Sequence, residues 1–80
     1  MNEKKNLNIE ETFALAVQNH KKNNLQVAEK LYKKILNTNP NSAGVHNNLG
    51  MMYKELEEYK KAINCYEKTF KDRGYGFIGL

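Results

Sequence analysis

Apolar residues recur at intervals of three or four along most of the chain, which is the spacing of one face of an α-helix. Four such stretches follow one another, over residues 9–20, 25–36, 45–56 and 59–70. No segment alternates apolar and polar residues for long enough to predict a strand. We therefore expect an all-α protein whose helices are about 13 residues long and are joined by tight turns.

The breaks between these stretches hold residues that end helices or favour turns. Residues 23–24 are both asparagine, which tolerates the left-handed backbone of a tight turn. Pro40 forces the residue before it out of helical geometry and so ends the second helix, and Asn41 or Ser42 can cap the third. The break at residues 57–58 contains neither glycine nor proline. Short connections of this kind predict two antiparallel helix pairs.

The apolar pattern has an internal period of 34 residues. Identical residues return at this distance, namely Leu15 as Leu49, Ala28 as Ala62 and Tyr32 as Tyr66. Small residues stand where the two helices of a pair must approach closely, Ala16 with Ala28 and Gly50 with Ala62. We expect the two tyrosine rings to fill the gaps between successive pairs while their hydroxyls reach water.

These positions resemble the signature of the tetratricopeptide repeat, a pair of helices in 34 residues. The second unit matches it as His46-x-x-Leu49-Gly50-x-x-Tyr53 followed by Ala62-x-x-x-Tyr66, and the first as Leu15-Ala16, Ala28, Tyr32 and Pro40. The resemblance implies two tandem helix-turn-helix hairpins that stack into a short right-handed α-solenoid. It divides the chain into a polar lead-in (1–8), repeats at 9–42 and 43–76, and an apolar tail (77–80).

The formal net charge is +4, from 12 lysines and one arginine against nine acidic residues. Arginine supplies the bidentate contacts that nucleic-acid recognition favours, and the lysines are dispersed in pairs along the chain. We interpret the charge as solvated helix faces. Nucleic-acid binding is the weaker alternative, and it predicts an affinity that falls steeply with salt. Glutamates precede lysines by four residues at Glu29–Lys33, Glu57–Lys61 and Glu67–Lys71, which predicts ion pairs along helices.

The sequence contains no recognisable catalytic, metal or cofactor site. His20 and His46 fall in different helices without further ligands at helical spacing, so we expect both at the surface or rim. Cys65 has no histidine at pairing distance, and we expect a half-exposed, reduced thiol. We predict a non-enzymatic protein that needs neither a metal nor a cofactor. The polar N-terminus and the absence of a long apolar run predict a cytoplasmic location without membrane contact.

The resemblance also implies where a partner would bind. In the tetratricopeptide family the first helices of successive repeats line a concave groove that holds peptides, so the resemblance implies a protein–protein interaction or scaffold module. The groove positions implied here are Phe13, Val17, His20, Asn47, Asn48, Met51 and Lys54. Asn48 is notable because a carboxamide can donate and accept at once and so hold a peptide backbone. It resembles an asparagine in the repeats of protein O-linked sugar transferases, so the alternative is a substrate-presenting arm of a larger enzyme.

The fourth stretch has an apolar face, and no further helix is predicted after it to cover that face. We expect a self-association face at Ile63, Tyr66, Phe70, Phe77 and Ile78. Three arrangements would cover it: the tail folds back over it, two copies stack as a homo-oligomer, or further repeats follow in a longer protein. Self-association or truncation is favoured over a stable lone monomer.

Overall fold

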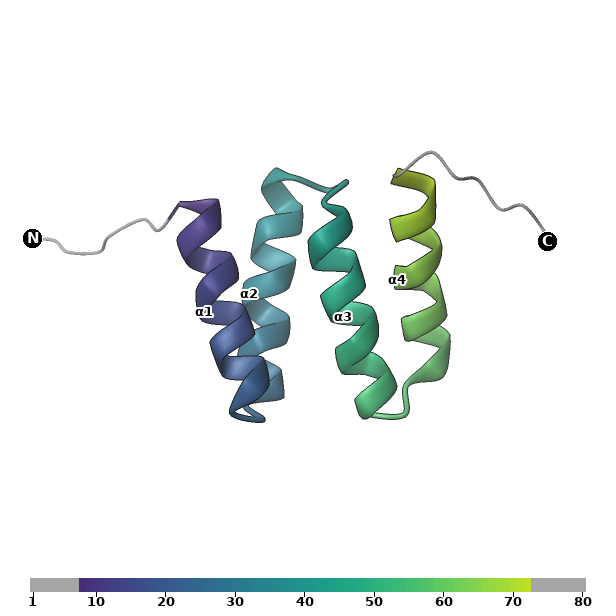
Figure 1. The fold of residues 1–80 in the computed structure, drawn as a ribbon, viewed down its shortest axis with the longest axis horizontal. Helices are drawn as coiled ribbons and strands as arrows, with labels where there is room; N and C mark the ends of the chain where they lie inside the picture. The colour runs from purple at the N-terminus through teal and green to yellow at the C-terminus, as the bar shows by residue number, and fades with distance from the viewer. Residues whose placement is uncertain (1–7, 73–80) are drawn as a thin grey trace, which may run out of the picture.

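Four helices lie side by side in a single row, each antiparallel to the one before it (Figure 1). The structure is a computed structural model that describes the backbone of residues 8–72 and the side chains of residues 8–69. The helices are α1 (Ile9–Lys21), α2 (Leu25–Thr38), α3 (Ala43–Glu55) and α4 (Tyr59–Asp72). The prediction of an all-α, solenoid-like fold is confirmed. Most of the lead-in, Gly74 and the apolar tail lie outside the described residues.

The helix ends follow local capping chemistry. Asn8, which the apolar pattern places in the lead-in, is the N-cap of α1: its side chain accepts a hydrogen bond from the Glu11 amide at 2.7 Å. The Glu11 carboxylate in turn accepts from the Asn8 amide at 3.1 Å, which completes a capping box. Of the two residues expected to cap α3, Ser42 does so, through its hydroxyl and the Val45 amide at 3.3 Å.

Two turns reverse the chain through left-handed residues. Asn23 has φ 67°, as expected of an asparagine between α1 and α2. The second reversal places Glu57 at φ 61°, a conformation that costs a residue with a β-carbon about 1–2 kcal/mol. Because Glu57 lies in this turn, the predicted Glu57–Lys61 pair is wrong, and Lys61 pairs with Glu58 at 3.7 Å instead. The predicted pair of Glu29 and Lys33 forms at 3.2 Å.

Small residues allow the two helices of each hairpin to pack closely. We call α1 with α2 hairpin 1, and α3 with α4 hairpin 2. Ala16 and Ala28 are fully buried in hairpin 1. In hairpin 2, a β-carbon on Gly50 would lie 2.7 Å from the Tyr66 ring, closer than van der Waals contact allows. The Tyr66 ring therefore packs within its own hairpin, against α3.

Tyr32 is the largest fully buried side chain and lies where hairpin 1 meets α3. Its ring packs edge-on against Phe13, with centroids 6.1 Å apart, and against His20 at 6.3 Å. Its hydroxyl accepts a hydrogen bond from the Asn48 side chain at 3.4 Å. The expectation that this hydroxyl reaches water is wrong, because α3 covers it. Burial also raises the pKa of Tyr32.

A second polar contact joins the hairpins beside α3. The Tyr53 hydroxyl on α3 donates to the Glu29 carboxylate on α2 at 2.6 Å, and Lys33 lies 3.2 Å from the same carboxylate oxygen. The hydrogen bond from Tyr53 is the main reason that the pKa of Glu29 lies below its ordinary value. Burial, and then the Glu29 contact, raise the pKa of Tyr53 well above the ordinary range. The ionised carboxylate therefore favours the stacked hairpins.

We expect Tyr53→Phe to lower the free energy of unfolding by about 1–2 kcal/mol at pH 7, because it removes a hydrogen bond to a charged acceptor. Because the pKa of Glu29 is lower in the folded protein, its ionised carboxylate stabilises the fold at pH values above the unfolded pKa of 4.5. This stabilisation is lost as the pH falls below that value. The gap between wild type and variant should therefore narrow in acid. Chemical denaturation between about pH 7 and pH 3 measures the gap.

Tyr59→Phe is the matched control, since the Tyr59 side chain is exposed and the same hydroxyl is removed. It should leave stability unchanged at every pH. A gap for Tyr53→Phe that is equal at neutral and acid pH would contradict the assignment to the ionised Glu29.

Candidate peptide-binding groove

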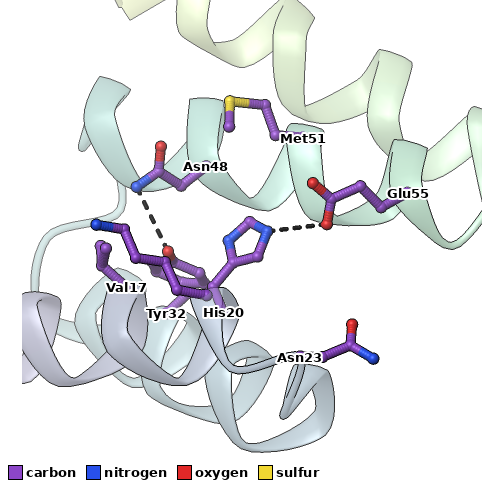
Figure 2. Close-up of a pocket in the computed structure, with 8 residues that line it drawn as sticks. Val17, His20, Asn23, Tyr32, Asn48, Met51 and Glu55 are labelled. Carbon is purple, nitrogen blue, oxygen red and sulfur yellow. Dashed lines mark hydrogen bonds and ion pairs between the residues drawn. The ribbon is translucent and has the colours of Figure 1, made fainter.

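A groove with a volume of about 480 Å³ lies where α1 and α3 face each other across the boundary between the hairpins (Figure 2). We call it the α1–α3 groove. Residues from both hairpins line it, so it exists only while the hairpins stack. The lining residues are Val17, His20, Lys21, Asn23, Tyr32, Asn48, Met51 and Glu55.

Asn48 supplies a polar group within the groove. Its side-chain nitrogen donates to the Tyr32 hydroxyl at 3.4 Å, which orients the carboxamide. Figure 2 shows the carboxamide oxygen directed away from Tyr32. No described residue donates to that oxygen. The half-buried side chain thus retains an acceptor and a second N–H, the two groups that pair with a peptide backbone.

His20 and Glu55 close one end of the groove. The His20 imidazole on α1 lies 3.0 Å from the Glu55 carboxylate on α3, so this contact also links the two hairpins. The His20 side chain is largely covered, in part by the Tyr32 ring, whereas Glu55 is largely exposed. Figure 2 shows the pair as a bridge between the helices. The His20–Glu55 pair gives this end of the groove polar groups that can hydrogen-bond to a polar side chain of a partner.

Apolar contact in the groove comes from Val17 on α1 and Met51 on α3. Met51 is 42% exposed, a high value for a large apolar side chain that lines a groove. Methionine adapts its shape to varied partners because its side chain is unbranched and polarisable. The groove therefore combines an adaptable apolar side with a backbone-matching carboxamide.

The sequence of these hairpins is similar to those of known repeat proteins. Residues 43–71, which form α3 and most of α4, match the family model of the tetratricopeptide repeat. Tetratricopeptide repeat protein 21B of Xenopus laevis is 36% identical over 58 residues, which cover 69% of this chain. Both comparisons support the tetratricopeptide repeat family. The chain spans 4% of the length of that relative, and no solved structure gives a significant match.

The family match bears on the general role of this kind of repeat. Tetratricopeptide repeats generally mediate protein–protein interaction, and the family points to a non-catalytic repeat module. The family model covers hairpin 2, which corresponds to the second repeat expected from the sequence. The exact repeat boundaries at 9–42 and 43–76 stay a prediction.

The structure brings four of the seven expected groove residues together: Val17, His20, Asn48 and Met51. Phe13 instead packs beneath the groove, against the Tyr32 ring. Asn47 and Lys54 are exposed and lie outside the lining. Sequence reasoning missed Glu55, although it follows Asn48 by seven residues and Met51 by four, which places all three on one helix face.

Two side chains expected near the surface are buried. His46 is 5% exposed, and its Nε2 donates to the Pro40 carbonyl oxygen at 2.8 Å, so it fastens the turn between the hairpins to α3. Cys65 is 8% exposed in the hydrophobic core, and burial raises the pKa of its thiol. Both expectations are therefore wrong, because neighbouring helices cover positions that a single helix would expose.

The expected self-association face is partly described. Ile63 on α4 is 56% exposed, and Tyr59, one turn before it, is also exposed. Tyr66 is half-buried against Gly50. The side chain of Phe70 and the whole of Phe77 and Ile78 lie outside the described residues.

Other kinds of site have no support within residues 8–69. No three His, Cys, Asp or Glu side chains there are grouped closely enough to hold a metal ion. None of the helices traced in the structure is long and apolar enough to cross a membrane. Among the described residues, the α1–α3 groove is therefore the best-defined candidate site.

Proposed function

We propose that this chain is a protein–protein interaction module that holds an extended segment of a partner protein in the α1–α3 groove. The observation that carries the proposal is the Asn48 carboxamide, held by Tyr32 with its oxygen free of described donors, beside the apolar side chains of Val17 and Met51. An extended backbone offers an N–H and a C=O that match this carboxamide. Apolar side chains on either side would pack on Val17 and Met51.

The charges of the groove favour broad rather than charge-selective binding. Lys21 supplies one positive charge and Glu55 one negative charge, and His20 contacts the latter. No excess of either sign is present among the lining residues. Selectivity would then come from backbone extension and from apolar side chains, so many sequences could bind with modest affinity.

A cytoplasmic location stays a prediction.

To test this, a peptide is selected from a random library displayed on phage, and its dissociation constant is measured by calorimetry. We expect Asn48→Ala to weaken binding about 2- to 10-fold, the value of one neutral hydrogen bond. Asn47→Ala is the matched control, because Asn47 is the adjacent asparagine of α3 and lies outside the groove. Met51→Ser, at an exposed position, should weaken binding without changing stability.

Chemical changes in the peptide test the backbone contact separately. N-methylation of the peptide's backbone amides should weaken binding, because it removes the N–H groups that would donate hydrogen bonds to the Asn48 side-chain oxygen. Replacing the peptide's polar side chains should have little effect. Equal losses for the Asn47 and Asn48 variants, or binding that ignores N-methylation, would contradict the proposal.

A second candidate is that the chain presents substrate protein to an attached enzyme, such as a sugar transferase. The resemblance of Asn48 to an asparagine in the repeats of those enzymes carries this alternative, and the groove would act in the same way in both. The coding sequence on either side of the chain distinguishes them. A catalytic domain in the same reading frame would support presentation, and its absence would favour a free-standing module.

We further propose that the outer face of α4 associates with a second copy of the chain. Tyr59 and Ile63 stand one turn apart and are both more than half exposed, at 57% and 56%. Sedimentation equilibrium should show a mass that rises with concentration, and Ile63→Lys should restore the monomer. Val27→Lys is the control, since Val27 is an exposed apolar residue on α2. A monomer at every concentration would contradict this proposal.

A further inference from the structure

A second groove lies on the opposite face of α3, and its chemistry differs from that of the α1–α3 groove. It has a volume of about 250 Å³. Its lining comes from α2, α3 and α4: Lys33, Leu36, His46, Leu49, Tyr53, Lys61, Asn64, Cys65 and Lys68. We call it the lysine groove. At 100° per residue, its α3 members point away from Asn48, Met51 and Glu55, so the two grooves are independent surfaces.

The charge of the lysine groove is one-sided. Three lysines line it and no acidic residue does. Lys33 and Lys61 contact Glu29 and Glu58, which stand outside the lining, but both lysines are more than half exposed. Exposed pairs of this kind contribute about 0–1 kcal/mol and can exchange partners readily.

Lys68 is the third lysine of the groove lining. It forms no ion pair with any carboxylate of the described side chains. Its charge acts on the Cys65 thiol at the floor, where Lys68 and Lys33 oppose the larger effect of burial on the thiol pKa. The positive potential therefore extends into the groove as well as over its rim.

The floor is apolar and small. Leu36 and Leu49 contribute apolar surface, and Lys61 lies over the Tyr53 ring, 5.4 Å from its centroid. A volume near 250 Å³ is below the roughly 300–1,000 Å³ of small-molecule sites, so it suits a side chain of a larger partner. The Tyr53 ring could stack on a nucleic-acid base, but it is only 6% exposed. A nucleic acid is therefore disfavoured as the partner of this groove.

The spacing of the lysines indicates the register of a partner. Lys61 and Lys68 are seven residues apart on α4, which corresponds to about 10 Å along the helix axis. Residues i and i+4 of an extended peptide are about 13 Å apart and face the same side. Flexible lysine side chains can make up the difference between these two distances. Residue i+2 of the peptide then points into the groove floor between Lys61 and Lys68.

We propose that the lysine groove binds an acidic, extended peptide segment in which two acidic side chains flank one apolar side chain, in the pattern acidic-x-apolar-x-acidic. The acidic groups pair with Lys61 and Lys68, and the apolar side chain occupies the space above Leu36 and Leu49. This surface is separate from the α1–α3 groove, so one chain can hold two partner segments at once.

The test uses the full chain and an amidated peptide containing Glu-Ser-Leu-Ser-Glu, measured by calorimetry at low salt. Lys68→Glu should weaken binding about 5- to 10-fold, because an attraction becomes a repulsion. Lys60→Glu makes the same charge change on α4 outside the groove and should alter binding less than about twofold. Lys68→Gln is the milder variant, since a glutamate late in α4 opposes the helix dipole.

Peptide variants and shift mapping complete the test. Replacing the central leucine by serine should also weaken binding several-fold, and amide shifts should map to Leu49 and Cys65 rather than to Asn48 and Met51. Equal effects of Lys60→Glu and Lys68→Glu, or no effect of removing the leucine, would overturn the proposal. So would an oligouridylate that binds this face while the acidic peptide does not. Loss of binding in the α1–α3 groove leaves these readouts unchanged, so the two proposals fail independently.

Discussion

Burial of the Tyr32 ring where hairpin 1 meets α3 is the contact on which the rest of the structure depends. The ring is fully buried, it packs against side chains of α1, and its hydroxyl accepts from Asn48 on α3. A single hairpin cannot cover this ring, so the hairpins must stack. Stacking then fixes α1 opposite α3 and creates the α1–α3 groove. The bond between Tyr53 and Glu29 holds the same boundary from the other side of α3.

Much of the fold could be predicted because it follows from local rules. Helical spacing, the stop at Pro40 and the left-handed Asn23 each act within a few residues, and the structure confirms them. The failures concern contacts between helices. His46 and Cys65 are buried because neighbouring helices cover them, and no periodicity within one helix reports that cover. The candidate groove was predictable in part, since the resemblance supplied α1 and α3, while the His20–Glu55 link depends on their three-dimensional approach.

The two faces of α3 give a small protein two surfaces of different character. One face carries a carboxamide and an exposed methionine with balanced charge, which suits an extended backbone of varied sequence. The other carries a small apolar floor beneath lysines, which suits an acidic segment. Both surfaces draw residues from both hairpins. Any change that separates the hairpins would therefore abolish both kinds of binding while leaving the helices formed.

Nuclear Overhauser effects in solution test the stacked arrangement most directly. The central claim is that Tyr32 and Tyr53 each contact the other hairpin. The account predicts cross-peaks between the Tyr32 ring protons and the Asn48 side-chain amide, and between the Tyr53 ring and the Glu29 methylenes. Helical shifts throughout α1 to α4 without either set of cross-peaks would contradict it, because the hairpins would then form without stacking.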